Sequence, residues 1–261
     1  MNLRALSVVS AVAALAVIAS EARAAVTYST DFNLVESPIS EAGAWRHDGL
    51  DWAHVATARG LAYGTQTGNG GFDDSYAYLS GFPPDQSASA VVHRDPATGG
   101  TTHEVEILLR WSDSAHSARG YECNFAYDGS YASIVRWNGP KSDFTVIDPA
   151  GGPGRVAGGL HDGDVVKAQI VGSVITTFIN GKPLSSTTDT VYRDGNPGIG
   201  LWRGAPSAPI DDFALTSFEA TSQTSSVGVP ASVPTRLTWR GLACLALVGA
   251  ALAFVWLKNR R

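Results

Sequence analysis

Two glutamates share one face of a predicted strand near the middle of the chain. In the segment 103–111, His-Glu-Val-Glu-Ile-Leu-Leu-Arg-Trp, Glu104 and Glu106 are two positions apart. Side chains alternate between the two faces of a strand, so both carboxylates point the same way, about 7 Å apart. Two carboxyl groups at such a separation can act as the acid and the base of glycoside hydrolysis. The same pair could instead form a solvated strand face that pairs with arginine.

Further polar residues extend this face if the neighbouring predicted strands pair with it. The predicted ligand-binding set is Glu106, Arg110, Glu122, Asn124 and Arg136, taken from three consecutive strands. A polar face with aromatic rings nearby can hold a sugar by hydrogen bonds and ring stacking, and the chain has seven Trp. The alternative is an ordinary outer face with cross-strand ion pairs.

The elements that position these residues are predicted to be strands throughout 25–219. Short alternating apolar runs end at Gly, Pro, Asn or Asp, and no long helical periodicity interrupts them. Asn180-Gly181 after one such run predicts a two-residue hairpin turn. The pattern predicts an all-β sandwich or jelly roll. The predicted strands are 26–32, 53–57, 76–80, 88–93, 103–111, 120–126, 132–137, 143–147, 164–171, 174–180, 198–202 and 212–219.

The charge of this region excludes one class of partner. The whole chain of 261 residues has a net charge of −5, but 25–220 holds 12 Lys and Arg against 23 Asp and Glu, a net charge of −11. Phosphate contacts need cations, so nucleic acid is not an expected partner. The two cysteines are Cys123, in this region, and Cys244, in an apolar tail. We therefore expect no internal disulfide, and the fold must rest on its apolar core.

The N-terminus has the pattern of a secretory signal peptide over residues 1–24. Arg4 precedes the apolar run 5–19, and Ala22-Arg23-Ala24 provides small residues at a cleavage site. We expect export of the chain.

The C-terminus is predicted to hold a linker and a membrane span. Residues 220–238 include a Ser, Thr and Pro-rich spacer, and 239–261 include the apolar run 241–257 with basic residues after it. Seventeen helical residues would span about 26 Å, at the short limit for a bilayer. Basic residues stay cytoplasmic, so the domain would lie outside the cytoplasm, either anchored or released after processing of the tail.

The second half of the domain resembles concanavalin A-like (laminin G-like) jelly rolls. The resemblance is carried by Gly163–Gly172, Ile175–Gly181, Thr188-Asp189 and Gly198–Trp202. Arg119–Cys123 and Arg136–Gly139 resemble the bacterial branch that includes 3-keto-disaccharide hydrolase domains. The resemblance implies the fold, which serves lectins, glycosidases, lyases and adhesive modules alike.

Two expectations come from this resemblance. Laminarinase-type enzymes of the fold use Glu-x-Asp-x-x-Glu, but here the third acidic position is Leu109. In related glucanase-like jelly rolls the Asp that opens the last strand binds a structural calcium, and its counterpart here is Asp211. The resemblance therefore implies a possible calcium ion and leaves catalysis without its usual signature.

The tail resembles C-terminal sorting signals of the PEP-CTERM type, in the IPTL-CTERM variant. The matching residues are Val233, Pro234, Thr235, Trp239, Arg260 and Arg261, whereas Arg236 and Thr238 depart from the pattern. The resemblance implies a membrane transpeptidase or protease as a partner.

Three hypotheses of function remain open from the sequence. The favoured one is a secreted or surface-anchored module that binds carbohydrate. The second is a structural protein of an extracellular matrix or biofilm without a small ligand. The third is a glycoside hydrolase or lyase that uses Glu104 and Glu106.

Overall fold

Strands make up almost all of the regular structure of the described residues in a computed structural model. The structure describes residues 24–48, 51–67, 74–95, 103–204 and 212–223. The chain divides into two units, 1–224 and 225–261, and every described residue belongs to the first. Within these described ranges no helix is long and apolar enough to cross a membrane. The predicted membrane span, the sorting residues and most of the predicted signal peptide lie outside them.

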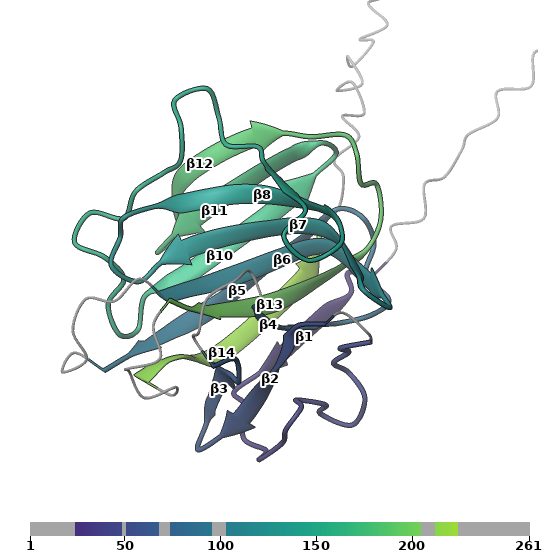
Figure 1. The fold of residues 1–261 in the computed structure, drawn as a ribbon, viewed down its shortest axis with the longest axis vertical. Coiled ribbons are helices and arrows are strands. Elements are labelled where there is room, and N and C mark those ends of the chain that lie inside the picture. The colour runs from purple at the N-terminus through teal and green to yellow at the C-terminus, as the bar shows by residue number, and fades with distance from the viewer. Residues whose placement is uncertain (1–23, 49–50, 68–73, 96–102, 205–211, 224–261) are drawn as a thin grey trace, which may run out of the picture. The chain divides into compact units, whose positions relative to one another are not determined.

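Fourteen strands form one curled sheet in this part of the chain (Figure 1). Their bounds are β1 Thr27–Thr30, β2 Ala53–Ala58, β3 Leu61–Gly64, β4 Ser75–Tyr78, β5 Gln86–Arg94, β6 His103–Ser114, β7 Ser117–Ala126, β8 Ala132–Gly139, β9 Phe144–Val146, β10 Val165–Val171, β11 Val174–Ile179, β12 Lys182–Thr188, β13 Asn196–Arg203 and β14 Phe213–Ser222.

The order of the strands folds the sheet into two layers. The path runs β12-β11-β10-β5-β14-β3-β2-β4-β13-β6-β7-β8-β9, and β1 pairs with β14. Strand β2 joins the layers, because it pairs with β3 on one side and with β4 on the other. We call β4, β13 and β6–β9 the second layer.

The main core lies between the layers. Alternate residues of β6 and β7, among them Ile107, Leu109 and Phe125, pack with Ile170 and Phe218 from the opposite layer. Each of these side chains is fully buried, and burial of such a side chain stabilises the fold by about 1.5–3 kcal/mol. The all-β sandwich predicted from the sequence is confirmed.

One hairpin shows how local sequence sets the register. Strands β11 and β12 are joined at Asn180 and Gly181, which have φ angles of 49° and 75°. A type I′ turn needs positive φ at both central residues, and Asn-Gly meets that need with little strain. The sequence predicted this turn, although it did not predict β12 or the short β3 as strands.

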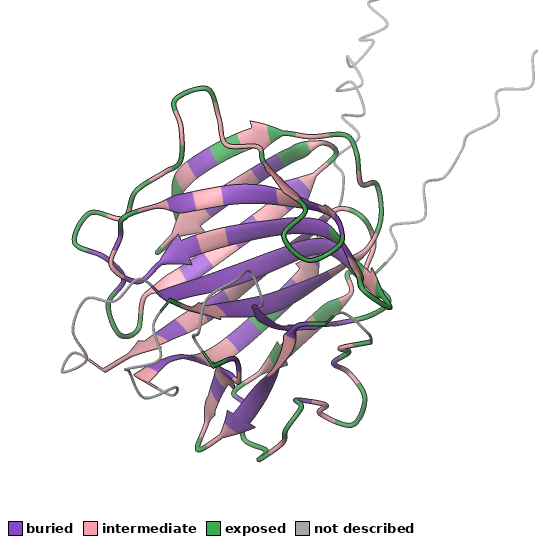
Figure 2. Cartoon of the chain, in the orientation of Figure 1, coloured by how far each residue is buried: buried purple, intermediate pink, exposed green. Residues whose placement is uncertain are grey.

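Burial differs between the two layers (Figure 2). Strand β10 alternates between buried and half-buried residues, as expected for one solvated face. In contrast, the first nine residues of β6 are all buried, on both faces. The outer face of the second layer is therefore covered or hollowed, and Glu104 and Glu106 of β6 lie there.

Candidate functional site

The outer face of the second layer brings the predicted acidic residues together. Glu106 lies opposite Asn124 of β7, and Asn124 lies opposite Ser133 of β8. Directly opposed residues in a sheet share a face. By the same alternation Glu104 and Glu122 point to this side. Four of the residues predicted from the sequence thus occupy one surface.

Asp74 is a further acid at this place. The sequence marks it only as part of one of several Asp-rich loops whose hard oxygen ligands suit calcium, and does not place it on this face. It precedes β4 and has the parity of Tyr76, which lies opposite Gly200 of β13, itself opposite Glu106. Carboxylate oxygens of Asp74, Glu106 and Glu122 lie within 4.8 Å of one another. Their residues are 5%, 1% and 3% exposed. We call these three residues the acidic cluster.

The partners of the carboxylates differ. Glu104 accepts a hydrogen bond of 2.8 Å from Asn124 Nδ2 and another from the Tyr131 hydroxyl. Glu122 accepts one of 2.7 Å from the indole Nε1 of Trp137. In the described part of the chain neither oxygen of Glu106 has a hydrogen-bond partner. A buried polar group without a partner is rare in a folded protein and calls for an explanation.

Burial and mutual repulsion favour protonation of these acids. Burial, followed by the charges of Asp74, Glu122 and Glu104, raises the pKa of Glu106 well above its ordinary value. Burial and the charge of Glu104 raise the pKa of Glu122 to about 8, although the hydrogen bond from Trp137 acts in the opposite direction. At neutral pH, Glu122 can therefore carry a proton and donate it, or exchange it for a cation.

A glycine provides the space for Glu106. A Cβ atom on Gly200 would lie 2.0 Å from Glu106 Oε2, so no larger residue fits there without displacing the carboxylate. The strand pairing places these two residues directly opposite each other. The missing side chain at position 200 thus lets Glu106 lie flat on the sheet.

A pocket of about 520 Å³ opens over this face, and we call it the outer pocket. Its polar lining includes Asp74, Glu104 and Glu122, and its apolar lining includes the half-buried rings of Phe144 and Trp202. Asn124, Tyr131, Ser133, Val135, Trp137, Val146, Asp148 and Pro153 complete the lining. A volume of this size, with polar groups converging beside aromatic rings, is typical of a small-ligand site.

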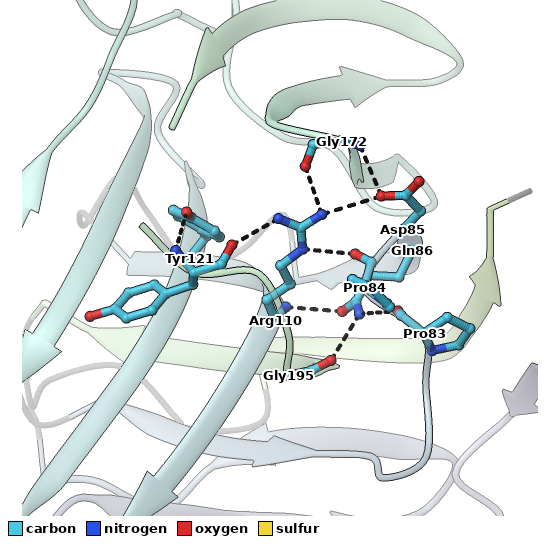
Figure 3. Close-up of polar contacts among 9 residues, drawn as sticks. Pro83, Pro84, Asp85, Gln86, Arg110, Tyr121, Gly172 and Gly195 are labelled. Atoms are coloured by element: carbon cyan, nitrogen blue, oxygen red, sulfur yellow. Dashed lines mark hydrogen bonds and ion pairs between the residues drawn. The ribbon is translucent and has the colours of Figure 1, made fainter. Parts of the chain in front are cut away.

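Arg110, which the sequence assigned to this surface, does not line the outer pocket and instead makes the polar contacts drawn in Figure 3. The β6–β7 pairing shifts register between Leu109 and Ser112, and Arg110 has a φ of 48°. Such a bulge breaks the alternation of side chains. The guanidinium donates to the carbonyl oxygens of Pro84, Tyr192 and Gly172 at 2.8, 2.8 and 2.7 Å, and to Asp85 at 3.2 Å. It is a structural anchor away from the outer pocket.

Arg136 is also placed on the other side of the sheet. It lies opposite Tyr121, whose ring belongs to the main core, rather than opposite Glu122. Its guanidinium pairs with Asp189, which also accepts a hydrogen bond of 2.7 Å from the Tyr121 hydroxyl. The expectation that the two arginines join the glutamates on one face is wrong, because the strand parity of Arg136 is opposite to that of Glu122.

Two loop tryptophans lie apart from the outer pocket's lining. Trp45 and Trp52 are buried, at 4% and 6% exposed, so neither ring is presented to a ligand. Trp52 packs with Tyr76 and Trp111 in a second apolar cluster next to the acidic cluster. Asp211, the predicted calcium ligand, lies outside the described residues.

Comparisons with known proteins concern the fold. No protein-family model matches this sequence, and no curated protein matches it. Carbohydrate binding module CBM66 from Bacillus subtilis superposes at a TM-score of 0.46 and 15% identity, over 71% of this chain and 96% of that chain. The beta-porphyranase BpGH16B from Bacteroides plebeius gives 0.46 and 9%, over 78% and 94%. SCLam, a non-specific endo-beta-1,3(4)-glucanase from family GH16, gives 0.47 and 11%, over 77% and 92%. Neither an activity nor a residue role follows from likenesses at this level.

Proposed function

We propose that this protein binds carbohydrate in the outer pocket. The observation that carries the proposal is the composition of that pocket, in which Glu104, Asn124 and Ser133 lie beside the rings of Phe144 and Trp202. Sugars present hydroxyl groups, which pair with carboxylate and amide groups, and apolar faces, which stack on aromatic rings. A volume of about 520 Å³ suits a short stretch of a glycan rather than a long apolar ligand.

We propose further that the protein acts outside the cytoplasm. The signal-peptide pattern of 1–24 and the basic, apolar tail of 239–261 support export and anchoring, with or without processing by a membrane transpeptidase. The net charge of −11 for residues 25–220 supports a neutral or cationic glycan as the ligand, because like charges repel.

Glycan cleavage is a second candidate, favoured by one observation. Glu122 and Asp74 both line the outer pocket, and the pKa of Glu122 is about 8, so a protonated acid stands close to a second carboxyl group. Retaining glycosidases need two carboxyl groups about 5–5.5 Å apart, one of them protonated. Glu106 does not line the pocket, so the pair predicted from the sequence, Glu104 and Glu106, is not the favoured one.

A glycan-array screen of the purified full-length chain tests the proposal. We expect dose-dependent binding to one family of glycans, and we expect the bound glycans to remain intact. Binding followed by release of shorter products that Glu122→Gln abolishes would favour the second candidate. The absence of binding to any glycan would contradict carbohydrate recognition and leave a structural role.

A further inference from the structure

The acidic cluster has the chemistry of a cation site. Asp74, Glu106 and Glu122 contribute three carboxylates, and no nitrogen or sulfur ligand joins them within the described residues. Hard oxygen ligands of this kind suit calcium, which takes six to eight oxygens at about 2.3–2.6 Å. Oxygens within 4.8 Å of one another can share such an ion, because two ligands on opposite sides of it are about 4.6–5.2 Å apart.

An acidic cluster alone would not indicate a ligand, but Glu106 adds a separate observation. Its side chain is 1% exposed, and both of its oxygens lack a hydrogen-bond partner within the described residues. A structural acid buried this deeply is normally paired with a cation or a donor, as Glu104 is with Tyr131 and Asn124. Glu106 instead points at two other acids.

The surroundings are consistent with a built site. Gly200 leaves the space in which the Glu106 carboxylate lies, since a Cβ there would be 2.0 Å from Oε2. Glu122 is held by Trp137, whose indole donates to its Oε2 at 2.7 Å. A ligand fixed by such an outer hydrogen bond is characteristic of metal centres. Asp74 and Glu122 also line the outer pocket, so water or hydroxyl oxygens from the pocket can reach an ion between them.

We propose that Asp74, Glu106 and Glu122 bind one calcium ion at the floor of the outer pocket. The ion neutralises carboxylates that otherwise repel one another at short range. This site is distinct from the calcium expected at Asp211. The proposal goes beyond carbohydrate binding, because cation binding can be measured with no glycan present, and either idea can fail while the other stands.

Terbium luminescence tests the proposal directly. Terbium replaces calcium in oxygen sites, and the indole of Trp137 is close enough to the site to sensitise its emission when tryptophan is excited. We expect the full-length chain, stripped of metal by a chelating resin, to give a sensitised signal that saturates at one equivalent. Calcium should displace this signal. Glu106→Gln, which keeps the shape of the side chain but removes its charge, should weaken terbium binding about 100-fold or more.

Two further variants keep the result interpretable. Glu219→Gln removes one exposed acid of β14 and should leave terbium binding unchanged, which controls for net charge. If Glu106→Gln loses the near-ultraviolet circular dichroism of the folded protein, it has not folded correctly. Glu122→Gln is then tested in its place and should weaken terbium binding to the same extent. The proposal is overturned if calcium up to about 10 mM displaces no sensitised signal, or if the folded cluster variants bind terbium as tightly as Glu219→Gln.

Discussion

Replacing Arg110 by Met should cost this protein a large part of its stability without altering the outer pocket. The Arg110 side chain is 4% exposed and donates to three carbonyl oxygens and to Asp85. Met has a similar length but no charge and no donor, so these four acceptors lose their shared partner. The backbone N–H of Arg110 still donates to Gln86 Oε1 at 2.9 Å, so the bulge itself keeps one of its bonds.

The size of the effect follows from two opposing contributions. Each hydrogen bond from a charged donor contributes about 1.5–3 kcal/mol net, so four would suggest a loss above 6 kcal/mol. The charge also has a desolvation cost of several kcal/mol, which disappears with it. Removal of one partner from buried ion pairs costs about 3–5 kcal/mol, and we expect a loss of that size in the free energy of unfolding.

Urea unfolding at pH 7, followed by tryptophan fluorescence, measures this loss. Arg136→Met is the matched control: its side chain is 20% exposed and pairs with Asp189, so its loss should be smaller, about 1–2 kcal/mol. Folded Arg110→Met should bind glycan like the unaltered protein. A loss below about 1 kcal/mol, or a selective loss of glycan binding, would refute the assignment of Arg110 as a structural anchor.

Three other predictions follow from the same structure. Burial, followed by the charge of Arg203, lowers the pKa of His103 to about 4. As the pH falls, the unfolded chain takes up a proton at this histidine before the folded protein does, so the free energy of unfolding should fall by up to about 3 kcal/mol between pH 6.5 and 4. Urea unfolding across this pH range should show that His103→Leu lacks this pH-dependent loss. An equal pH slope in both proteins would contradict that reasoning. Gly200→Ala should displace Glu106 and weaken terbium binding at least about tenfold, and unchanged affinity would show that the close approach is unimportant. Calcium at about 100 times its Kd should stabilise the fold by about 2.7 kcal/mol, which corresponds to a rise of about 5–11 °C in the midpoint of thermal unfolding. A chelator or the Glu106→Gln substitution should remove this rise. Identical midpoints with and without chelator would contradict the cation site.

Alternation along single strands was enough to predict part of the site. It placed Glu104 and Glu106 on one face and Glu122 with Asn124 on the next strand, because parity within a strand is a local property. It failed at Arg110, where the bulge after Leu109 breaks the period of two. The local sequence gives no signal for this bulge, because its positive φ is adopted by Arg110 and not by a glycine.

The positions of the other site residues depend on the pairing between strands, which is not a local property of the sequence. The side chains around Arg136 alternate as predicted. Whether Arg136 shares a face of the sheet with Glu122 depends on the register between β7 and β8. Asp74 lies near Glu106 only because β13 is inserted between β4 and β6 in the sheet. Gly200 of β13 is more than 90 residues further along the chain than Glu106. Along its own segment, the alternation of Asp74 with Tyr76 and Tyr78 marks a second polar and aromatic face.

Two strands were missed, one because of its length and the other because of its composition. Strand β3 has four residues and ends at Gly64, so its alternation is too brief to stand out from a turn. Strand β12 contains Pro183 and a run of Ser and Thr, which are typical of loops. It forms at the end of the sheet, where an edge position tolerates proline. The Asn-Gly turn sets its register as far as Pro183, after which a bulge shifts the pairing by one residue.

The most direct test of carbohydrate binding in the outer pocket is a calorimetric titration of the strongest array ligand into two aromatic variants. Phe144→Ala removes a half-buried ring that lines the pocket. Phe178→Ala removes a half-buried ring of β11, which packs under Lys167 in the other layer. We predict that Phe144→Ala weakens binding at least about tenfold, the equivalent of one stacking contact, and that Phe178→Ala binds like the unaltered protein. Equal affinity in all three folded proteins would contradict the pocket as the binding site.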